Sequence, residues 1–308
     1  MTVHIYNPSH DEALAINREQ YCPSSAARRT GEKFWDIAKH WKRPEDFILH
    51  LPDDGSLRNV ALPDWSRVTA IEPWGWDRHI VGVLRKLGAP ERLLPSDEQL
   101  DRIRELSSRQ TAVRVVEALR SEPLPDGVMA AESRWCTTEE AVSDAIRDYG
   151  GRAILKQPWS CSGRGVWASE SPSSLQRVKK SLRDQGAVEV EPLYENLADF
   201  AMEFEADGQG RVSYAGLSVF ATRDGGGYAG NVVAPQEELR RRLESKAARP
   251  LPLEPLAARL CTVLAAVLAG DYCGPLGVDM MLTPAGIHPC IEVNLRNTMG
   301  RVALFGAV

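Results

Sequence analysis

The sequence lacks several features that would assign it to large classes of protein. No run of about 18 apolar residues is present, so no segment is expected to cross a membrane. The first residues do not show a basic segment followed by an apolar one, which predicts no signal peptide and a cytoplasmic location. The six cysteines include no CxxC pair and no nearby histidine at zinc-ligand spacing. They are therefore expected to be reduced thiols, most of them packing residues.

Positive charge is also scarce. The 308 residues include 37 Lys and Arg against 42 Asp and Glu, which gives a formal net charge of -5. A protein that coats nucleic acid needs clustered basic side chains to neutralise phosphates, so no nucleic-acid partner is expected. With 43% hydrophobic and 26% charged residues, the composition is that of an ordinary globular protein, long enough for two or three lobes.

Alternating strand and helix patterns predict a small α/β domain over residues 1–105. Apolar runs at 3–6, 47–51 and 68–71 are the expected strands. Polar residues after such strands lie at the carboxyl edge of a parallel sheet, where open α/β proteins bind ligands. The resulting substrate-site candidates are Asn7, His10, Asp11, Trp74 and Asp77. The alternative is a capped turn leading into a helix after the first strand, and simple packing for the tryptophan.

The middle of the chain contains a strand that ends in a lysine. Residues 152–156 form this strand, Lys156 is its last residue, and a loop of small residues runs from 157 to 166. Backbone N–H groups in such a loop can approach phosphate closely, and cations offset the negative charge. The loop is not a Walker motif, because GxxxxGK[ST] occurs nowhere in the chain. An ordinary hairpin with a solvent-facing lysine is the alternative.

The next strand, predicted at residues 187–193, runs into a proline-containing connector. Pro192 cannot donate a hydrogen bond to a sheet, so backbone groups would be left free there, as an adenine-binding hinge needs. Two alternating strands follow at 199–206 and 211–220, and a short turn joins them. This pattern predicts a pair of antiparallel strands after the hinge.

The chain is organised around its acidic end. Residues 276–282 and 287–293 flank a four-residue turn and predict a β-hairpin. Glu292 and Asn294 would share one face, and Asp279 could join them from the partner strand. Two carboxylates and an amide oxygen are hard ligands that suit Mg²⁺ held jointly with phosphate oxygens. The alternative is the solvated outer face of an antiparallel hairpin.

Taken in this order, the motifs resemble the ATP-grasp superfamily, in particular an uncharacterised bacterial branch similar to carboxylate-amine ligases. The segments that carry the resemblance are 7–8, 73–76, 106–109, Lys156 with its loop, 190–193, Asp279 and 292–300. The resemblance implies an α/β fold with a Rossmann-like (pre-ATP-grasp) domain at 1–105. A two-lobed ATP-grasp fold with antiparallel sheets would follow, with the phosphate loop in lobe 106–192 and the metal site in lobe 193–308.

The resemblance also implies roles for individual residues. Lys156 matches the lysine that contacts the α-phosphate and the adenine edge. Arg109 stands where the family usually has a lysine, a departure that keeps the charge but introduces a planar fork. The mobile loop that closes on the phosphates is matched by Ser160, Ser162, Gly163, Arg164 and Gly165. The adenine hinge is matched by Glu191 and Leu193, the ribose-binding acid by Glu195 or Asp199, and the magnesium ligands by Asp279, Glu292 and Asn294.

A second departure concerns positive charge near the metal site. Several relatives carry an arginine close to the residue matched by Asp279, whereas the sequence here is Gly-Pro-Leu-Gly-Val. Arg296 and Arg301 could supply that charge as catalytic residues, and Arg296 is the first choice because it directly follows the metal strand. Asn297, in the same segment, joins the substrate-site candidates.

The activity that the resemblance implies is ATP-dependent ligation. A substrate carboxylate is activated as an acyl phosphate and captured by an amine, with release of ADP and phosphate. The expected cofactors are ATP and Mg²⁺, with Mn²⁺ as a substitute, and the expected partners are small-molecule or peptide carboxylates and amines. The protein could form a homodimer. The alternatives are an ATP-grasp-type small-molecule kinase and a nucleotide-binding protein without turnover.

Overall fold

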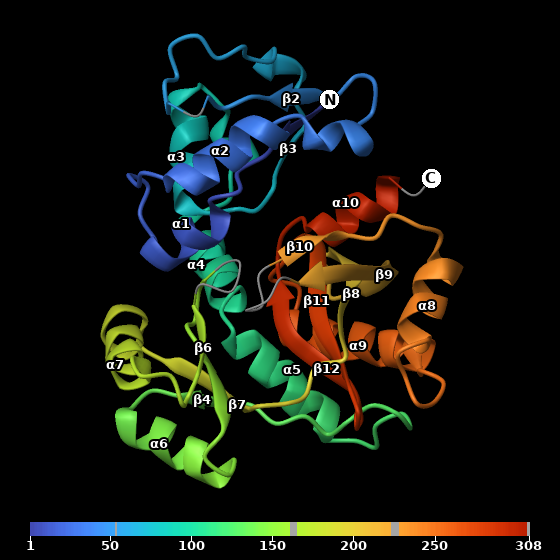
Figure 1. Cartoon of the computed structure of the whole chain (residues 1–308). Helices are drawn as coiled ribbons and strands as arrows, with labels where there is room; N and C mark the ends of the chain where they lie inside the picture. Colours follow the sequence, from blue (N-terminus) through green and yellow to red (C-terminus); the bar gives the residue numbers. More distant parts are fainter. Residues whose placement is uncertain (53, 161–164, 223–227, 307–308) are drawn as a thin grey trace. The chain divides into compact units, whose positions relative to one another are not determined.

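The computed structural model describes residues 1–52, 54–160, 165–222 and 228–306, and its fold is mixed α/β (Figure 1). The chain forms two compact units. Unit 1 comprises Met1–Glu105 together with the short segment Arg296–Thr298, and unit 2 comprises the rest of the chain. The segment 296–298 therefore leaves the predicted carboxyl-terminal lobe and belongs to unit 1. None of the described helices is long and apolar enough to cross a bilayer.

Unit 1 is built on a parallel three-stranded sheet of order β2–β1–β3. The strands are β1 (Thr2–Ile5), β2 (Phe47–Leu49) and β3 (Ala70–Pro73). The helices are α1 (His10–Ile16), α2 (Ser25–Phe34), α3 (Arg78–Lys86) and α4 (Asp97–Leu106), with 3-10 turns at Ile37–His40, Trp65–Arg67 and Glu91–Leu93. Because β1 has a neighbour on each side, its carboxyl end lies where the strand order reverses, the place at which open α/β sheets bind ligands.

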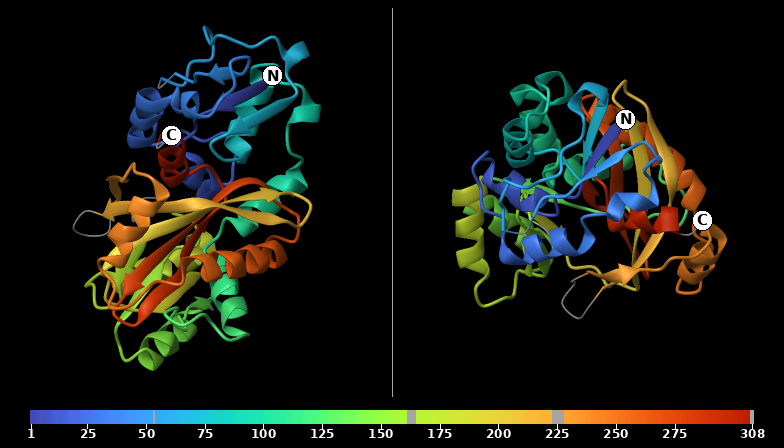
Figure 2. Two further views of the ribbon diagram at one scale, coloured as in Figure 1. Left: turned by 90° about the vertical axis from the view of Figure 1, so that its right-hand side faces the viewer. Right: turned by 90° about the horizontal axis from the view of Figure 1, so that it is seen from above.

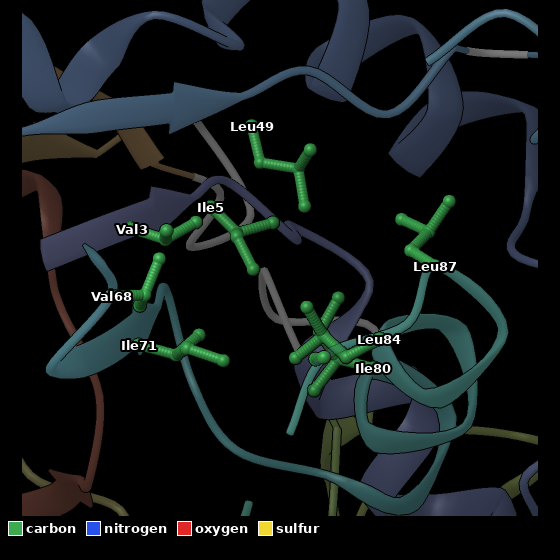
Figure 3. Close-up of a cluster of buried hydrophobic side chains, with 9 residues drawn as sticks. Val3, Ile5, Leu49, Val68, Ile71, Ile80, Leu84 and Leu87 are labelled. Carbon is green, nitrogen blue, oxygen red and sulfur yellow. The ribbon is translucent and has the colours of Figure 1, made fainter. Parts of the chain in front are cut away.

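Aliphatic side chains from the sheet and from α3 form the core of unit 1 (Figure 3). Ile80, Leu84 and Leu87 recur at intervals of four and three residues, so they lie on one side of α3 and pack together. They meet Val3, Ile5, Leu49, Val68 and Ile71. Asp77 begins the helix, because its side chain accepts a hydrogen bond from the backbone N–H of Ile80 at 2.8 Å. The start of α3 is thereby fixed close to the end of β3.

The third strand begins two residues later than the apolar run at 68–71 predicts. Val68 closes the 3-10 turn before the strand and is buried in the core. Glu72 and Pro73 are part of β3, where they pair with His4 and Ile5. Since β3 is an edge strand with β1 as its neighbour, the missing N–H of the proline leaves no sheet partner unsatisfied.

The first of two antiparallel sheets in unit 2 has four strands in the order β4–β7–β5–β6. They are β4 (Arg134–Cys136), β5 (Ala153–Lys156), β6 (Val166–Ala168) and β7 (Val188–Pro192). Helices α6 (Glu139–Asp148) and α7 (Ser174–Gln185) bury Val142, Ala145 and Val178 in the core of this sheet. Pro192 still pairs with Ala153, and it lies beyond the end of β4, where β7 needs no N–H on that side.

The second sheet has five strands in the order β10–β9–β8–β11–β12. They are β8 (Ala198–Asp207), β9 (Val212–Thr222), β10 (Tyr228–Asn231), β11 (Cys273–Thr283) and β12 (Gly286–Asn294). The helices of unit 2 outside the first sheet are α5 (Gln110–Arg120), α8 (Gln236–Glu244), α9 (Leu253–Leu268) and α10 (Met299–Gly306). The hairpin predicted at the acidic end is confirmed by the antiparallel pairing of β11 and β12.

The two faces of this five-stranded sheet differ in character. Phe200, Met202 and Phe204 of β8 are buried and pair with Met280, Val278 and Leu276 of β11, so these six side chains share one apolar face. The alternate residues, among them Glu203, Asp279 and Glu292, lie on the opposite face. Helix α9 contacts β8 and β9, and α5 contacts α9 and β12 (Figure 1). Figure 2 shows the same sheet in yellow to red from two further directions.

Candidate nucleotide and metal site

Lys156 is the last residue of β5 and lies directly opposite Glu189 of β7. In this register Glu189 and Glu191 share the face that carries Lys156. The lysine Nζ lies 2.8 Å from Glu191 Oε2 and 3.5 Å from Glu189 Oε1, and it donates a hydrogen bond to the backbone oxygen of Ile291 at 3.1 Å. All three charged side chains are buried. The predicted lysine is thus held between two carboxylates and strand β12.

Burial and charge act against each other in this cluster. Burial alone would lower the pKa of Lys156, but Glu189 and Glu191 raise it above its usual value, so the lysine is charged. Burial raises the pKa of Glu189 to about 6, although Lys156 and Arg109 pull it down. Ser133 supports that carboxylate by donating its hydroxyl to Oε1 at 2.8 Å. The ammonium of Lys156 thus lies between the carboxyl groups of Glu189 and Glu191.

Arg109 immediately precedes α5, as predicted, and its side chain reaches three parts of unit 2. Nη1 donates to the backbone oxygen of Gln157 at 2.9 Å and to Ser160 Oγ at 2.7 Å. Nη2 donates to Glu292 Oε2 at 3.0 Å, and Nε lies 3.9 Å from Glu189 Oε2. Only 4% of the side chain is exposed. The arginine therefore links the phosphate loop of the sequence prediction to the predicted metal strand.

The three predicted metal ligands share the polar face of the five-stranded sheet. Asp279 pairs directly with Glu292, and Asn294 pairs with Gly277, two residues from Asp279 on the same strand. Asn294 donates its side-chain amide to Asp279 Oδ2 at 3.1 Å. All three side chains are half-buried. The structure brings together the set that the sequence assigned to the metal.

This donor set is compatible with Mg²⁺ shared with phosphate oxygens. Magnesium is commonly held by one or two carboxylates together with the phosphates of its substrate, while a dedicated all-protein cage is unusual. Within the described part of the chain, no group of three or more His, Cys, Asp and Glu residues is arranged to hold a metal. Two carboxylates with an amide oxygen match a donor set of the shared kind.

Lys156 bonds to β12 in a stretch where the strand changes register. Between the pairs Asp279–Glu292 and Met281–His288, one residue of β11 faces three residues of β12. Such an irregularity takes backbone groups out of the regular ladder. The backbone oxygen of Ile291, within this irregular stretch, is the one that accepts the hydrogen bond from Lys156. The bulge thereby joins the lysine to the residue next to Glu292.

The remaining nucleotide-site candidates lie after β5, in the connector between β7 and β8, and at the start of β8. Ser160 and Gly165 follow β5, and the backbone N–H of Gln157 donates to Gly165 O at 2.8 Å. Cys161, Ser162, Gly163 and Arg164 lie outside the described residues. Leu193 and Glu195 are exposed in the connector between β7 and β8. Asp199 lies on β8 and accepts a hydrogen bond from Asn196 at 2.9 Å.

The substrate-site candidates of unit 1 meet at the carboxyl ends of β1 and β3. Asn7 Nδ2 donates to Gly75 O at 2.8 Å and to Asp77 Oδ2 at 3.1 Å. His10 Nδ1 lies 3.2 Å from the same carboxylate oxygen. Gly75 must lack a side chain, because a Cβ there would lie 2.6 Å from the His10 ring. Asn7, His10, Trp74 and Asp77 are all buried, so in this structure they form a closed polar cluster.

The arginines predicted as catalytic have different partners. Arg296, in unit 1, makes a two-pronged ion pair with Asp11, and both nitrogen–oxygen distances are 3.1 Å. Asn297 of the same segment donates its backbone N–H to Trp74 O at 2.8 Å. Arg301, in α10 of unit 2, forms an ion pair with Glu205 of β8 and lies against the Phe305 ring. The catalytic roles of both arginines stay predictions.

Two buried residues beside Lys156 were missed by the sequence prediction. Glu189 shares a face with Glu191, and the sequence signal was the pattern Glu-Val-Glu within one strand. His288 is fully buried on β12, and its ring contacts that of Tyr194 at a centroid distance of 5.2 Å. Burial, reinforced by the charge of Lys156, lowers the pKa of His288 to about 3, so its ring is neutral. A histidine inside an apolar strand gives no comparable signal.

Comparison with known proteins gives matches in structure alone. No protein-family model and no curated protein sequence matches this chain. D-alanyl-alanine synthetase A from Vibrio cholerae matches with a TM-score of 0.54 and 12% identity, over 99% of this chain and 91% of that one. D-cycloserine synthetase DcsG matches with a TM-score of 0.52 and 12% identity, over 100% of this chain and 98% of that one.

A third similar structure contains a nucleotide. The biotin carboxylase domain of 2-oxoglutarate carboxylase from Hydrogenobacter thermophilus, in complex with MgADP and bicarbonate, has a TM-score of 0.52 and 14% identity. The match covers 99% of this chain and 63% of that domain. These structures are ATP-grasp enzymes, so the ATP-grasp resemblance of the sequence is confirmed at the level of the fold.

Proposed function

We propose that this protein is an ATP-dependent ligase that activates a substrate carboxylate as an acyl phosphate for attack by an amine. One observation supports this proposal above the others. Arg109, Lys156 and the hairpin that carries Asp279 and Glu292 are far apart in the sequence, yet the two cations make direct contacts with Glu292 or with the residue beside it. Cations and carboxylates in this arrangement could hold a triphosphate and its metal together.

On the nucleotide side, Lys156 and Arg109 would offset the charge of the phosphates. The loop after β5, with Ser160 and Gly165 at its ends, would supply backbone N–H groups to the same phosphates. Glu191 and Leu193 would contact the adenine, and Glu195 or Asp199 the ribose. That the similar biotin carboxylase domain binds MgADP supports a nucleotide in this fold.

On the metal side, Asp279, Glu292 and Asn294 would hold Mg²⁺, which would neutralise charge on the phosphates. Glu292 Oε2 is engaged by Arg109, while its other oxygen and the amide oxygen of Asn294 would face the cation. The chain's own residues would do the remaining work. They would bind the nucleotide, orient the reacting groups and keep water away from the acyl phosphate.

On the substrate side, unit 1 would act as a Rossmann-like domain. Asn7, His10, Asp77 and Trp74 follow β1 and β3 at the place where the strand order reverses, and this supports a substrate role for them. Asp11, Arg296 and Asn297 would belong to the same surface. The acceptor would be a small molecule or a peptide that carries an amine, as the names of the two synthetases suggest for their own products.

The test is a screen of amino-acid pairs with MgATP, in which ADP, free phosphate and product mass are measured. The proposal predicts ADP and phosphate in equal amounts, and a product whose mass is that of the two substrates less one water. The variant Glu292→Gln is expected to lower the rate by about 100-fold or more, since electrostatic groups at a reacting centre contribute on this scale.

Two other outcomes would reject the ligase proposal. ADP without free phosphate, together with a phosphorylated product, would identify a small-molecule kinase. Binding of ADP together with no turnover of any of the amino-acid pairs tested would identify a nucleotide-binding protein. Equal phosphate release by wild type and Glu292→Gln would reject the assignment of Glu292 to the metal.

A further inference from the structure

The guanidinium of Arg109 is occupied by protein groups on several sides. Both N–H groups of Nη1 are used, one by the backbone oxygen of Gln157 and one by Ser160 Oγ. Nη2 donates to Glu292 Oε2, and Nε lies 3.9 Å from Glu189 Oε2. An arginine has five N–H donors, so at least three are committed here. The backbone N–H of Arg109 adds a bond to Pro158 O at 3.0 Å.

These contacts connect three segments that the proposed function uses. Gln157, Pro158 and Ser160 form the start of the phosphate loop, Glu292 is a proposed metal ligand, and Arg109 itself precedes α5. A carboxylate with one oxygen fixed by a guanidinium presents its other oxygen in a defined direction. Partners of this kind orient metal ligands, and their loss commonly weakens metal binding.

We propose that Arg109 is a positioning residue, which orients Glu292 for the metal and ties it to the start of the phosphate loop. This inference rests on the proposed function and assigns Arg109 a task beyond that of a cation for phosphate. It also accounts for arginine where the related fold usually has lysine. An ammonium is a point charge on a flexible stem, and it cannot reach the Gln157 oxygen, Ser160 and Glu292 in one plane as a guanidinium fork does.

The variant Arg109→Lys separates geometry from charge, because both side chains are cations. Binding of ADP is measured by isothermal titration calorimetry in EDTA and at increasing Mg²⁺ concentrations. Mg²⁺ is expected to increase the affinity for ADP, and the concentration that gives half of this increase is the Mg²⁺ requirement. We expect this requirement to rise by about 10-fold or more in Arg109→Lys. In EDTA the affinity of the variant for ADP is expected to stay within about 3-fold of wild type, since the charge is kept.

The matched control is Arg120→Lys at the end of the same helix, where the arginine is 44% exposed and lies 3.7 Å from Glu132. It is expected to bind Mg²⁺ and ADP as wild type does. Thermal unfolding of each variant shows whether it is folded. Ser160→Ala serves as a second variant, since it removes one of the contacts of Arg109 and leaves the arginine in place. It is expected to raise the Mg²⁺ requirement by about 3-fold, a fraction of the larger effect.

A double-mutant cycle with Glu292→Gln completes the test. If Arg109 acts through Glu292, the double variant gains as little ADP affinity from Mg²⁺ as Glu292→Gln alone, so Arg109→Lys has no further effect once Glu292 is neutral. Additive effects would overturn the proposal, as would an unchanged Mg²⁺ requirement in Arg109→Lys. If Arg109→Lys lost the same ADP affinity with and without Mg²⁺, Arg109 would be a phosphate ligand alone. That result would also overturn the proposal. Absence of ADP binding by wild type would instead reject the proposed function.

Discussion

Two pairs of carboxylates in unit 2 differ in how their negative charge is compensated. Glu189 and Glu191 have side chains that are 1% and 7% exposed, and Lys156 contacts both. Asp279 and Glu292 are half-buried, and Arg109 contacts Glu292 while the amide of Asn294 contacts Asp279. The first pair is closed within the protein. The second pair is only half-buried.

The difference follows from the cost of burying charge. An ionised carboxylate taken from water is retained only where a cation and hydrogen bonds compensate it. Lys156 meets this requirement for Glu189 and Glu191, and it gains a third contact with Ile291 O. A metal site needs carboxylates that are oriented but not yet neutralised. The buried pair Glu189–Glu191 is thus compensated within the protein, whereas the half-buried hairpin pair Asp279–Glu292 is the one that we propose to bind the metal.

The largest effect is expected from Lys156→Met. The substitution leaves two buried carboxylates without their ammonium, and breaking a buried pair in this way costs about 3–5 kcal/mol of unfolding free energy. Urea denaturation at pH 7 measures the loss. The loss is expected to be smaller at pH 5, because the pKa of Glu189 is already raised to about 6 and protonation removes its charge.

The control for this variant is Lys180→Met on the surface of α7. Lys180 is 62% exposed and pairs with Asp184 one helical turn away, so its loss is expected to cost about 0.5 kcal/mol or less. If Lys156→Met were no more destabilised than this control, the buried pair would not depend on the lysine.

The second effect concerns His288 and has a defined sign. Its pKa is lowered from 6.5 to about 3, so the native state binds fewer protons than the unfolded chain between these pH values. Stability from this group is therefore present above pH 6.5 and is lost as the pH falls. Between pH 7 and pH 4 the loss is about 3 kcal/mol. His288→Leu is expected to lack it, as urea denaturation at both pH values would show.

His40→Gln is the matched control, because His40 is exposed on the surface of unit 1. It is expected to keep the pH dependence of wild type. Parallel pH profiles for wild type and His288→Leu would contradict the assignment of a neutral, buried imidazole beside Lys156.

A smaller effect is expected from Gly300→Ala. Gly300 lies in α10 against Glu203, which shares the polar face of the sheet with Asp279 and Glu292. A Cβ at Gly300 would lie 2.0 Å from Glu203 Oε1 and 2.6 Å from Ser218 Oγ, so the buried Glu203 and Ser218 side chains or α10 would have to shift. Overpacking of this kind costs about 1–3 kcal/mol in unfolding free energy. Gly306→Ala, in the same helix, meets its nearest atom at 3.8 Å and is expected to be neutral or slightly stabilising. Equal stabilities for the two variants would show that α10 does not cover Glu203.

The sequence predicts the hairpin pair better than the buried pair, and the reason is distance along the chain. Asp279, Glu292 and Asn294 lie in one hairpin, where alternation within two strands predicts that they share a face. The pairing of Lys156 with Glu189 depends on the register of β5 against β7. These two strands are separated in the sequence by β6 and helix α7. Alternation in one strand cannot supply that register.

Two further features could not be predicted for similar reasons. Residues 296–298 belong to unit 1 because Asn297 bonds to Trp74, a contact between segments more than two hundred residues apart. The irregular pairing around Ile291, whose oxygen accepts a hydrogen bond from Lys156, depends on how β12 meets β11. Local patterns predicted the elements, while the contacts between them required the fold.

The most direct test of a joint nucleotide and metal site in unit 2 is ADP binding to wild type and Glu292→Gln, each with and without Mg²⁺. Isothermal titration calorimetry is expected to show tighter ADP binding by wild type when Mg²⁺ is added. Glu292→Gln is expected to bind ADP equally well in EDTA and to gain little from Mg²⁺. Full Mg²⁺ enhancement in the variant, or no ADP binding by wild type, would contradict the account.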